Sequence, residues 1–202
     1  MKQWIAAVFL GWGLVASAYA DGDPQAGESK AAVCASCHGQ SGAAPIQPAY
    51  PKLSGLGEAY LYRQLQHIKS GDRPIAEMTG LLDGMSEQDL QDLAAYYDQQ
   101  QTPIGKADPE LVARGEQLYR GGNLASGVPA CAGCHSPQGM GNEPGGFPRL
   151  SGQHPEYVIQ QLEAYRGGER NTGSMSQIMV DVASRLTDDE IRAVASYVSG
   201  LH

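Results

Sequence analysis

The sequence predicts an all-α protein made of two tandem copies of one small domain. Apolar residues recur at helical spacing in several segments, and no run of alternating apolar and polar residues is long enough to predict a strand. The chain also repeats itself: residues 51–55 (PKLSG) match residues 148–152 (PRLSG) at an offset of 97. Chance does not produce a shared register that continues over forty residues. The two halves are therefore expected to fold alike.

The first 20 residues are predicted to be a cleaved signal peptide. Lys2 supplies the positive start, residues 4–15 are apolar, and residues 18–20 (AYA) fit the small-x-small pattern of a cleavage site. The apolar run is short for a transmembrane span, although an uncleaved anchor is the alternative. The sequence thus predicts a periplasmic protein that begins near Asp21.

Each domain is expected to contain three helices in the same order. A proline begins a short helix ahead of a cysteine motif, a second helix ends at a glycine, and a last helix carries an apolar stripe. In the second domain Thr187 and Glu190 fit a capping box at the start of the last helix. The predicted helices span 24–33 and 58–69, then 109–120 and 155–166, with last helices after Ser86 and Thr187. The predicted units are a signal peptide at 1–20, a first domain at 21–100, a linker at 101–108 and a second domain at 109–202.

Each domain contains one C-x-x-C-H motif, and the two motifs use all four cysteines of the chain. This motif attaches a c-type haem: the cysteines form thioethers, and the histidine becomes the proximal ligand of the iron. A redox dithiol needs no following histidine, and a structural zinc site would bring both cysteine pairs within about 15–20 residues. The sequence therefore predicts two covalently bound haem c groups. The residues are Cys34, Cys37 and His38, and Cys131, Cys134 and His135.

The charge of the chain excludes one class of function. Without the signal peptide, 13 Lys and Arg stand against 22 Asp and Glu. Nucleic-acid binding requires a basic face, so it is not expected. An acidic surface allows docking on a basic patch of a partner, and it also serves simply to keep an exported protein soluble.

The motifs together resemble a known family. Each half is similar to a small class I cytochrome c, with a helix before C-x-x-C-H, a proline about a dozen residues later and a distal methionine before the last helix. The tandem plan, with the PKLSG and PRLSG segments, EMTG at 77–80 and GGFP at 145–148, resembles the dihaem cytochrome c4 family. The resemblance implies two class I domains, each wrapped around one haem, with the haems facing each other across the interface. It also implies that the carbonyls of Pro51 and Pro148 accept a hydrogen bond from the haem histidines.

Methionine is the expected second ligand of each iron, because a thioether raises the potential relative to a second histidine. In the first half Met78 is favoured over Met85, which directly precedes the helix cap and is expected to pack there. In the second half Met179 is favoured over Met175. Past Arg73 the offset grows to 101, and Met78 and Met179 both lie 12 residues before the first stripe residue of the last helix. Met140 lies too near His135 and is expected to cover a haem edge.

The predicted function is electron transfer without catalysis. By resemblance the protein carries electrons from a respiratory donor complex towards a terminal oxidase or reductase, and peripheral membrane association is left open. One alternative is the cytochrome subunit of a larger redox enzyme, such as a flavocytochrome sulfide dehydrogenase. Another is a dihaem peroxidase, which would need an open distal position and usually a longer chain.

Overall fold

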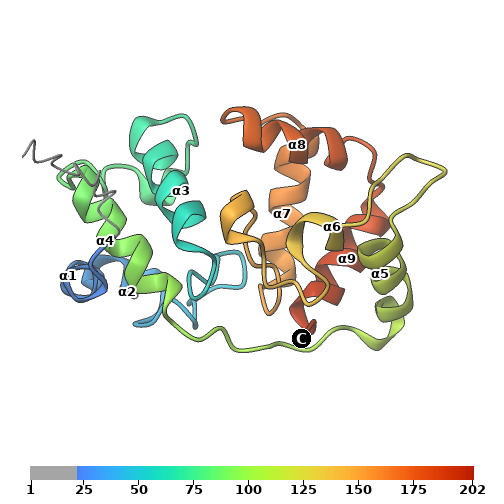
Figure 1. Ribbon diagram of the computed structural model, residues 1–202, viewed down its shortest axis with the longest axis horizontal. Coiled ribbons are helices and arrows are strands. Elements are labelled where there is room, and N and C mark those ends of the chain that lie inside the picture. The colour runs from blue at the N-terminus through green and yellow to red at the C-terminus, as the bar shows by residue number, and fades with distance from the viewer. Residues whose placement is uncertain (1–21) are drawn as a thin grey trace, which may run out of the picture.

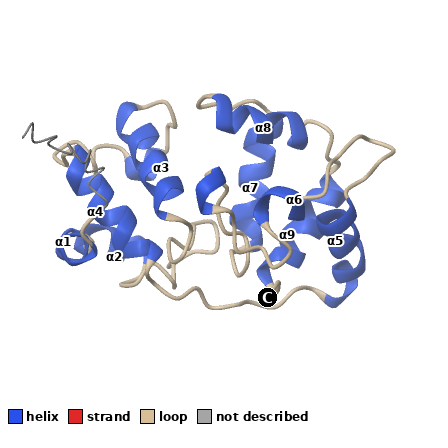
Figure 2. Ribbon diagram, in the orientation of Figure 1, coloured by secondary structure: helices blue, strands red, loops and turns tan. Residues whose placement is uncertain are grey.

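A computed structural model describes residues 22–202, so the predicted signal peptide lies outside the described residues. Helices and loops make up this part of the chain (Figure 2), with two isolated antiparallel bridges, from Asn123 to Val128 and from Asn142 to Phe147. The predicted all-α class is confirmed. Within residues 22–202 no helix is both long and apolar enough to cross a membrane.

The two halves lie side by side along the long axis of the molecule (Figure 1). The segment between them, yellow-green in the figure, runs along one edge from α4 to α5. Facing helices α3 and α7 occupy the middle. The first half consists of α1 (Pro24–Lys30), α2 (Ala32–His38), α3 (Glu58–Ser70), the 3₁₀ turn η1 (Ala76–Met78) and α4 (Glu87–Asp98). The second half consists of α5 (Pro109–Gly121), α6 (Ala132–His135), the 3₁₀ turn η2 (Glu143–Gly145), α7 (Pro155–Arg166), α8 (Ser174–Ala183) and α9 (Asp188–Ser199).

Capping side chains set where these helices begin. The Asp23 carboxylate accepts hydrogen bonds from two backbone N–H groups in the first turn of α1, and the Asp108 carboxylate accepts one from the first turn of α5. The predicted capping box of Thr187 and Glu190 is present at α9, and Ser86 forms another with Asp89 at α4.

The core of each half forms where its first helix crosses its last. A Cβ on Gly27 of α1 would lie 2.0 Å from the carbonyl oxygen of Asp92, and a Cβ on Gly115 of α5 would lie 2.4 Å from that of Ala193. Because glycine has no Cβ, the two backbones approach closely at these points. The remainder of each core includes aliphatic and aromatic side chains of the last helix, together with residues of α3 in the first half and of α5 and α7 in the second.

Two predicted elements differ from the structure. The helix expected at 24–33 is interrupted at Ala31, after which α2 carries the first cysteine motif. The second difference is α8, which lies in a stretch where only a four-residue insertion was expected. Its apolar residues Met175, Met179 and Val182 recur at helical spacing, which was the missed signal.

Candidate haem sites

A cavity lies beside each cysteine motif, and residues of both halves line each of the two cavities. The first has a volume of about 640 Å³ and the second about 390 Å³, sizes typical of cofactor sites. Both have mainly apolar walls. Cys34, Cys37 and His38 line the first cavity, and Cys131, Cys134 and His135 line the second, so the structure brings each predicted motif to its own cavity.

The two histidines are oriented by the same backbone contact. His38 Nδ1 donates to the carbonyl oxygen of Pro51 at 2.9 Å, and His135 Nδ1 donates to that of Pro148 at 2.8 Å. The predicted proline contacts are therefore confirmed. Burial lowers the pKa of both imidazoles, which are 8% and 7% exposed. A neutral ring with its Nδ1 hydrogen engaged presents Nε2 as a free ligand atom.

No disulfide joins the four cysteines, which all lie in the described part of the chain. Burial raises the pKa of Cys131 to about 11 and also raises the pKa of Cys34. Protonated thiols are weak nucleophiles and weak metal ligands. The raised pKa values of Cys34 and Cys131 therefore argue against a redox dithiol or a thiolate metal site.

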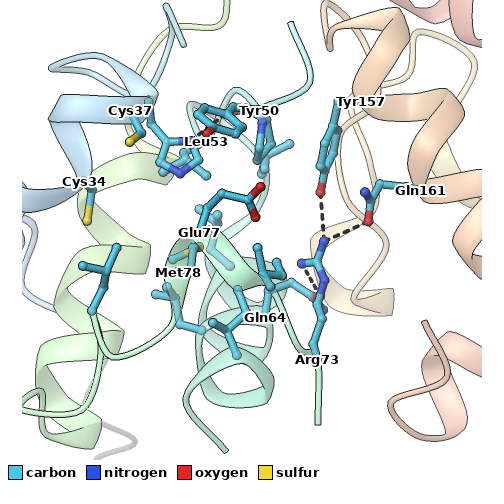
Figure 3. Close-up of a pocket in the computed structure, with 18 of the residues that line it drawn as sticks. Cys34, Cys37, Tyr50, Leu53, Gln64, Arg73, Glu77, Met78, Tyr157 and Gln161 are labelled. Atoms are coloured by element: carbon cyan, nitrogen blue, oxygen red, sulfur yellow. Dashed lines mark hydrogen bonds between the residues drawn. The ribbon is translucent and has the colours of Figure 1, made fainter. Parts of the chain in front are cut away.

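In the first half the two candidate methionines lie in different places, one at the cavity and one against the core. Met78 ends η1 and lines the first cavity, where Figure 3 shows it together with Cys34 and Cys37. Met85 instead packs against the hydrophobic core and does not line the cavity. The expectation for Met140 is wrong: its side chain is 54% exposed and is absent from the wall of the second cavity.

In the second half the structure brings both candidate methionines to the same cavity. Met175 and Met179 lie one turn apart on α8, and both line the second cavity. Met179 also packs against the core formed by α7 and α9. Helix α8 thus places two thioethers beside the second site.

Two buried arginines lie between the cavities. Arg73 donates to Tyr157 Oη at 3.2 Å and to Gln161 Oε1 at 2.9 Å, both on α7 of the other half (Figure 3). Arg170 reciprocates by donating to Tyr60 Oη at 2.7 Å and to Gln64 Oε1 at 2.9 Å on α3. These contacts join equivalent positions of the repeat. The offset of 97 aligns Tyr60, Gln64 and Arg73 with Tyr157, Gln161 and Arg170, but a repeat does not reveal which copies touch, so the sequence predicted no role for them.

The arginines are a test of whether the cavities fit haem. Arg73 and Arg170 are 8% and 5% exposed, and neither forms an ion pair within residues 22–202. Burial alone would raise the pKa of Tyr157, but the two guanidinium groups lower it. Buried cations require anionic partners. Haem propionates are such anions, so the cavity walls fit the group that the cysteine motifs attach.

Comparison with known proteins agrees with this site. A family model described as "Cytochrome c" matches residues 112–202, and one described as "Cytochrome C oxidase, cbb3-type, subunit III" matches residues 24–96. Among curated proteins, cytochrome c4 of Pseudomonas aeruginosa is 49% identical over 202 residues, covering all of both chains. The "Thiosulfate dehydrogenase electron acceptor" of Thiomonas intermedia is 35% identical, covering 98% of this chain and 91% of that protein.

Solved structures show the same similarity. Reduced recombinant cytochrome c4 from Pseudomonas stutzeri superposes with a TM-score of 0.86 and 49% identity, covering 90% of this chain and all of that one. Two cytochrome c domains with one attachment motif each define a dihaem c-type cytochrome, an electron-transfer protein that holds two covalent haem c groups. More narrowly, the chain belongs to the cytochrome c4 family, as its motifs predicted.

Proposed function

We propose that this protein is a periplasmic electron carrier of a respiratory chain, passing electrons from a donor complex towards a terminal oxidase or reductase. The observation that carries the proposal is the shared wall between the two cavities, since six residues line both. A bound haem supplies a one-electron ferric–ferrous couple. A shared wall places two such couples side by side, which suits a carrier that receives electrons at one end and delivers them at the other. The shared residues are Leu56, Tyr60, Gln64, Tyr157, Gln161 and Arg170.

The proposed axial ligands are His38 with Met78 and His135 with Met179, in domains at 21–100 and 109–202. In each half the histidine and at least one methionine line the same cavity. A methionine opposite the histidine leaves no open position for substrate, which favours a carrier over a peroxidase. Met179 is preferred because it matches Met78 in its spacing from the last helix, 12 residues before the first stripe residue.

The ligand proposal is tested by comparing Met179→Ala with Met175→Ala. Met179→Ala should remove the share of the second haem in the near-infrared methionine-to-iron charge-transfer band and lower the potential of that haem. Met175→Ala is the matched control one turn away on α8 and should leave both measurements nearly unchanged. The opposite result would assign the ligand to Met175.

The surface beside the first cavity supports transfer to protein partners. Val33 and Leu81 line this cavity and are each 43% exposed. Glu77 lines it too, and neither Glu77 nor the nearby Asp83 forms an ion pair in the described chain. An apolar patch beside unpaired acidic groups fits a partner whose own redox site is surrounded by basic side chains.

The carrier role is tested by mixing the fully reduced protein with respiratory membranes that contain a terminal oxidase. Oxidation of the haems should be rapid and should slow as the salt concentration rises, because the encounter between opposite charges is screened. Glu77→Gln should weaken that salt dependence, whereas Glu110→Gln, in the first turn of α5, should not. Failure of the membranes to oxidise the protein would contradict the proposal.

A second candidate is electron acceptance from a thiosulfate-oxidising enzyme. Two curated relatives carry the name "Thiosulfate dehydrogenase electron acceptor", at 35% and 32% identity. A solved thiosulfate dehydrogenase (TsdBA) from Marichromatium purpuratum contains a similar region, with a TM-score of 0.78 and 30% identity over 40% of that chain. Reduction of the haems by thiosulfate in the presence of such a dehydrogenase, and not without it, would support this role.

A further inference from the structure

A tyrosine ring lies near the first cysteine of each motif, but the two halves supply it from different helices. In the first half it is Tyr97 on α4, and in the second it is Tyr119 on α5. Aligning the helix crossings at Gly27 and Gly115 pairs Ala31 with Tyr119, and aligning the last helices pairs Tyr97 with Val198. The tyrosine therefore lies on the last helix in the first half and on the first helix in the second half. The smaller residues Ala31 and Val198 occupy the corresponding positions on the other helices.

The exchanged rings fill similar positions. Tyr97 lies 5.0 Å from the ring of Tyr96, and Tyr119 lies 5.6 Å from the ring of Tyr197, which is the repeat equivalent of Tyr96. Both exchanged rings are buried, with exposures of 3% and 0%. Cys34 contributes electrostatically to the raised pKa of Tyr97, and Cys131 contributes in the same way to the raised pKa of Tyr119. The two rings therefore have similar aromatic neighbours and similar burial in their own halves.

Their hydroxyl groups are not equivalent. Tyr119 Oη donates to the carbonyl oxygen of Ser136 at 2.7 Å, and Tyr119 does not line the second cavity. Tyr97 lines the first cavity, and its hydroxyl has no hydrogen-bond partner among residues 22–202 although it is buried. Cys34 lines the same cavity and packs against the cluster that contains Tyr97, and its sulfur affects the pKa of the phenol.

A buried hydroxyl without a partner costs free energy that phenylalanine would avoid at the same ring volume. The surroundings of Tyr97 are apolar, and they include Leu93, Ala94 and Leu53. The Cys34 thiol stands here for the thioether sulfur of the attached haem. Such a sulfur is a weak hydrogen-bond acceptor.

We propose that the hydroxyl of Tyr97 donates a hydrogen bond to the Cys34 sulfur and thereby raises the potential of the first haem, an interaction that the second haem lacks. A donor directed at the edge of the porphyrin stabilises the more electron-rich ferrous state. Tyr97 is a positioning and tuning residue that makes two similar sites inequivalent. The direction of electron flow within the molecule then depends in part on one hydroxyl group.

The test is Tyr97→Phe in the full-length dihaem protein, followed by spectroelectrochemical titration. One of the two one-electron steps should shift to lower potential while the other stays in place. At a fixed applied potential, the ferric-to-ferrous ratio of the affected haem should rise about two- to tenfold, the equivalent of one hydrogen bond. The C–S stretching band in the resonance Raman spectrum should shift as well.

Tyr119→Phe is the matched control, because it removes a hydroxyl from the equivalent ring without facing a haem cavity. It should lower stability through loss of the Ser136 contact and leave both redox steps unchanged. The proposal is overturned if Tyr97→Phe moves neither step, if Tyr119→Phe produces the same shift, or if the C–S band does not respond to Tyr97→Phe.

Discussion

The two halves share one scaffold but present their candidate distal ligands on different structures. In the first half Met78 ends η1, a single 3₁₀ turn, whereas in the second half Met179 lies within the ten-residue helix α8. The contacts that hold the histidines and join the first and last helices repeat closely in both halves. Duplication therefore preserved the proximal side, and the four-residue insertion was accommodated on the distal side.

The difference shows which side of the site tolerates change. On the proximal side, a cysteine motif, a histidine and a proline carbonyl must meet within a few ångströms, so an insertion there would break the contact. The distal segment only has to deliver one flexible thioether. A turn and a helix both meet that requirement, and the helix adds a second methionine beside the second cavity.

The largest expected effect tests the part that the halves share. Gly27→Ala and Gly115→Ala should each lower the free energy of unfolding by at least about 3 kcal/mol, because the added Cβ would meet a backbone carbonyl that cannot move aside. Gly27→Ala should cost more, since its contact is 2.0 Å rather than 2.4 Å. Denaturant unfolding followed by circular dichroism measures both.

Gly121→Ala on α5 is the control, because a Cβ there meets nothing within 4 Å. It should be neutral, or stabilising by less than about 1 kcal/mol. Equal losses for all three variants would mean that the helix crossings do not depend on the missing Cβ.

The next effect concerns the reciprocal arginines. Arg73→Gln and Arg170→Gln should each cost about 2–3 kcal/mol, since each removes charged hydrogen bonds into the other half. The double variant should cost less than the sum, because both arginines contact Gln64 and Gln161. Arg63→Gln, which loses one bond to the Gly146 carbonyl, is the milder comparison. Strict additivity would show that the two arginines act separately.

Much of this architecture could be predicted from the sequence, because its signals are local. Proline starts, capping residues and apolar stripes gave α7 with its observed bounds and α3 to within one residue. The cysteine motifs identified the two sites, and the resemblance to class I cytochromes c led to the proline–histidine contacts. These features depend on neighbours in the chain, which a sequence displays directly.

The remainder depends on packing between distant segments. Tyr60 and Arg170 are 110 residues apart, and nothing in either segment indicates that they meet. The exchange of Tyr97 and Tyr119 was hidden for the same reason, because the sequence does not show which residues of the first and last helices share a core. The helical spacing within α8 was visible, but the expected repeat of the first half favoured a loop there.

A smaller effect should separate the equivalent carboxylates of the two capping boxes. Burial raises the pKa of Glu190, but hydrogen bonds from Thr187 and Asn123 together with Arg114 outweigh burial, so the pKa is lowered overall. Glu190→Gln should cost about 1–2 kcal/mol at neutral pH by weakening the bonds to Arg114 and Asn123. Asp89→Asn in the first half should cost less, since Asp89 is more exposed.

The pH dependence of that loss has a defined sign. A carboxyl whose pKa is lower in the folded state stabilises the protein above its unfolded pKa, which is about 4.5 for glutamate. The stabilisation disappears as the pH falls through the lower folded value. The difference between wild type and Glu190→Gln should therefore be full at pH 7 and shrink below about pH 4.5 in a series of denaturant titrations. A difference that grows in acid would contradict the lowered pKa.

The smallest effect compares two serines at equivalent positions of the repeat. Ser151 Oγ donates to the Leu201 carbonyl at 2.8 Å and accepts from Arg149, whereas Ser54 Oγ is buried without a partner in the described chain. The reason lies two residues earlier: the first half has Lys52, whose ammonium donates to the carbonyls of Pro103 and Gly152 instead. Ser151→Ala should cost about 1 kcal/mol, and Ser54→Ala should be neutral or slightly stabilising because it removes an unsatisfied hydroxyl. Equal losses in denaturant unfolding would mean that Ser54 has gained a partner in the haem-loaded protein, so the two halves would be more alike in their buried polar contacts than their side chains suggest.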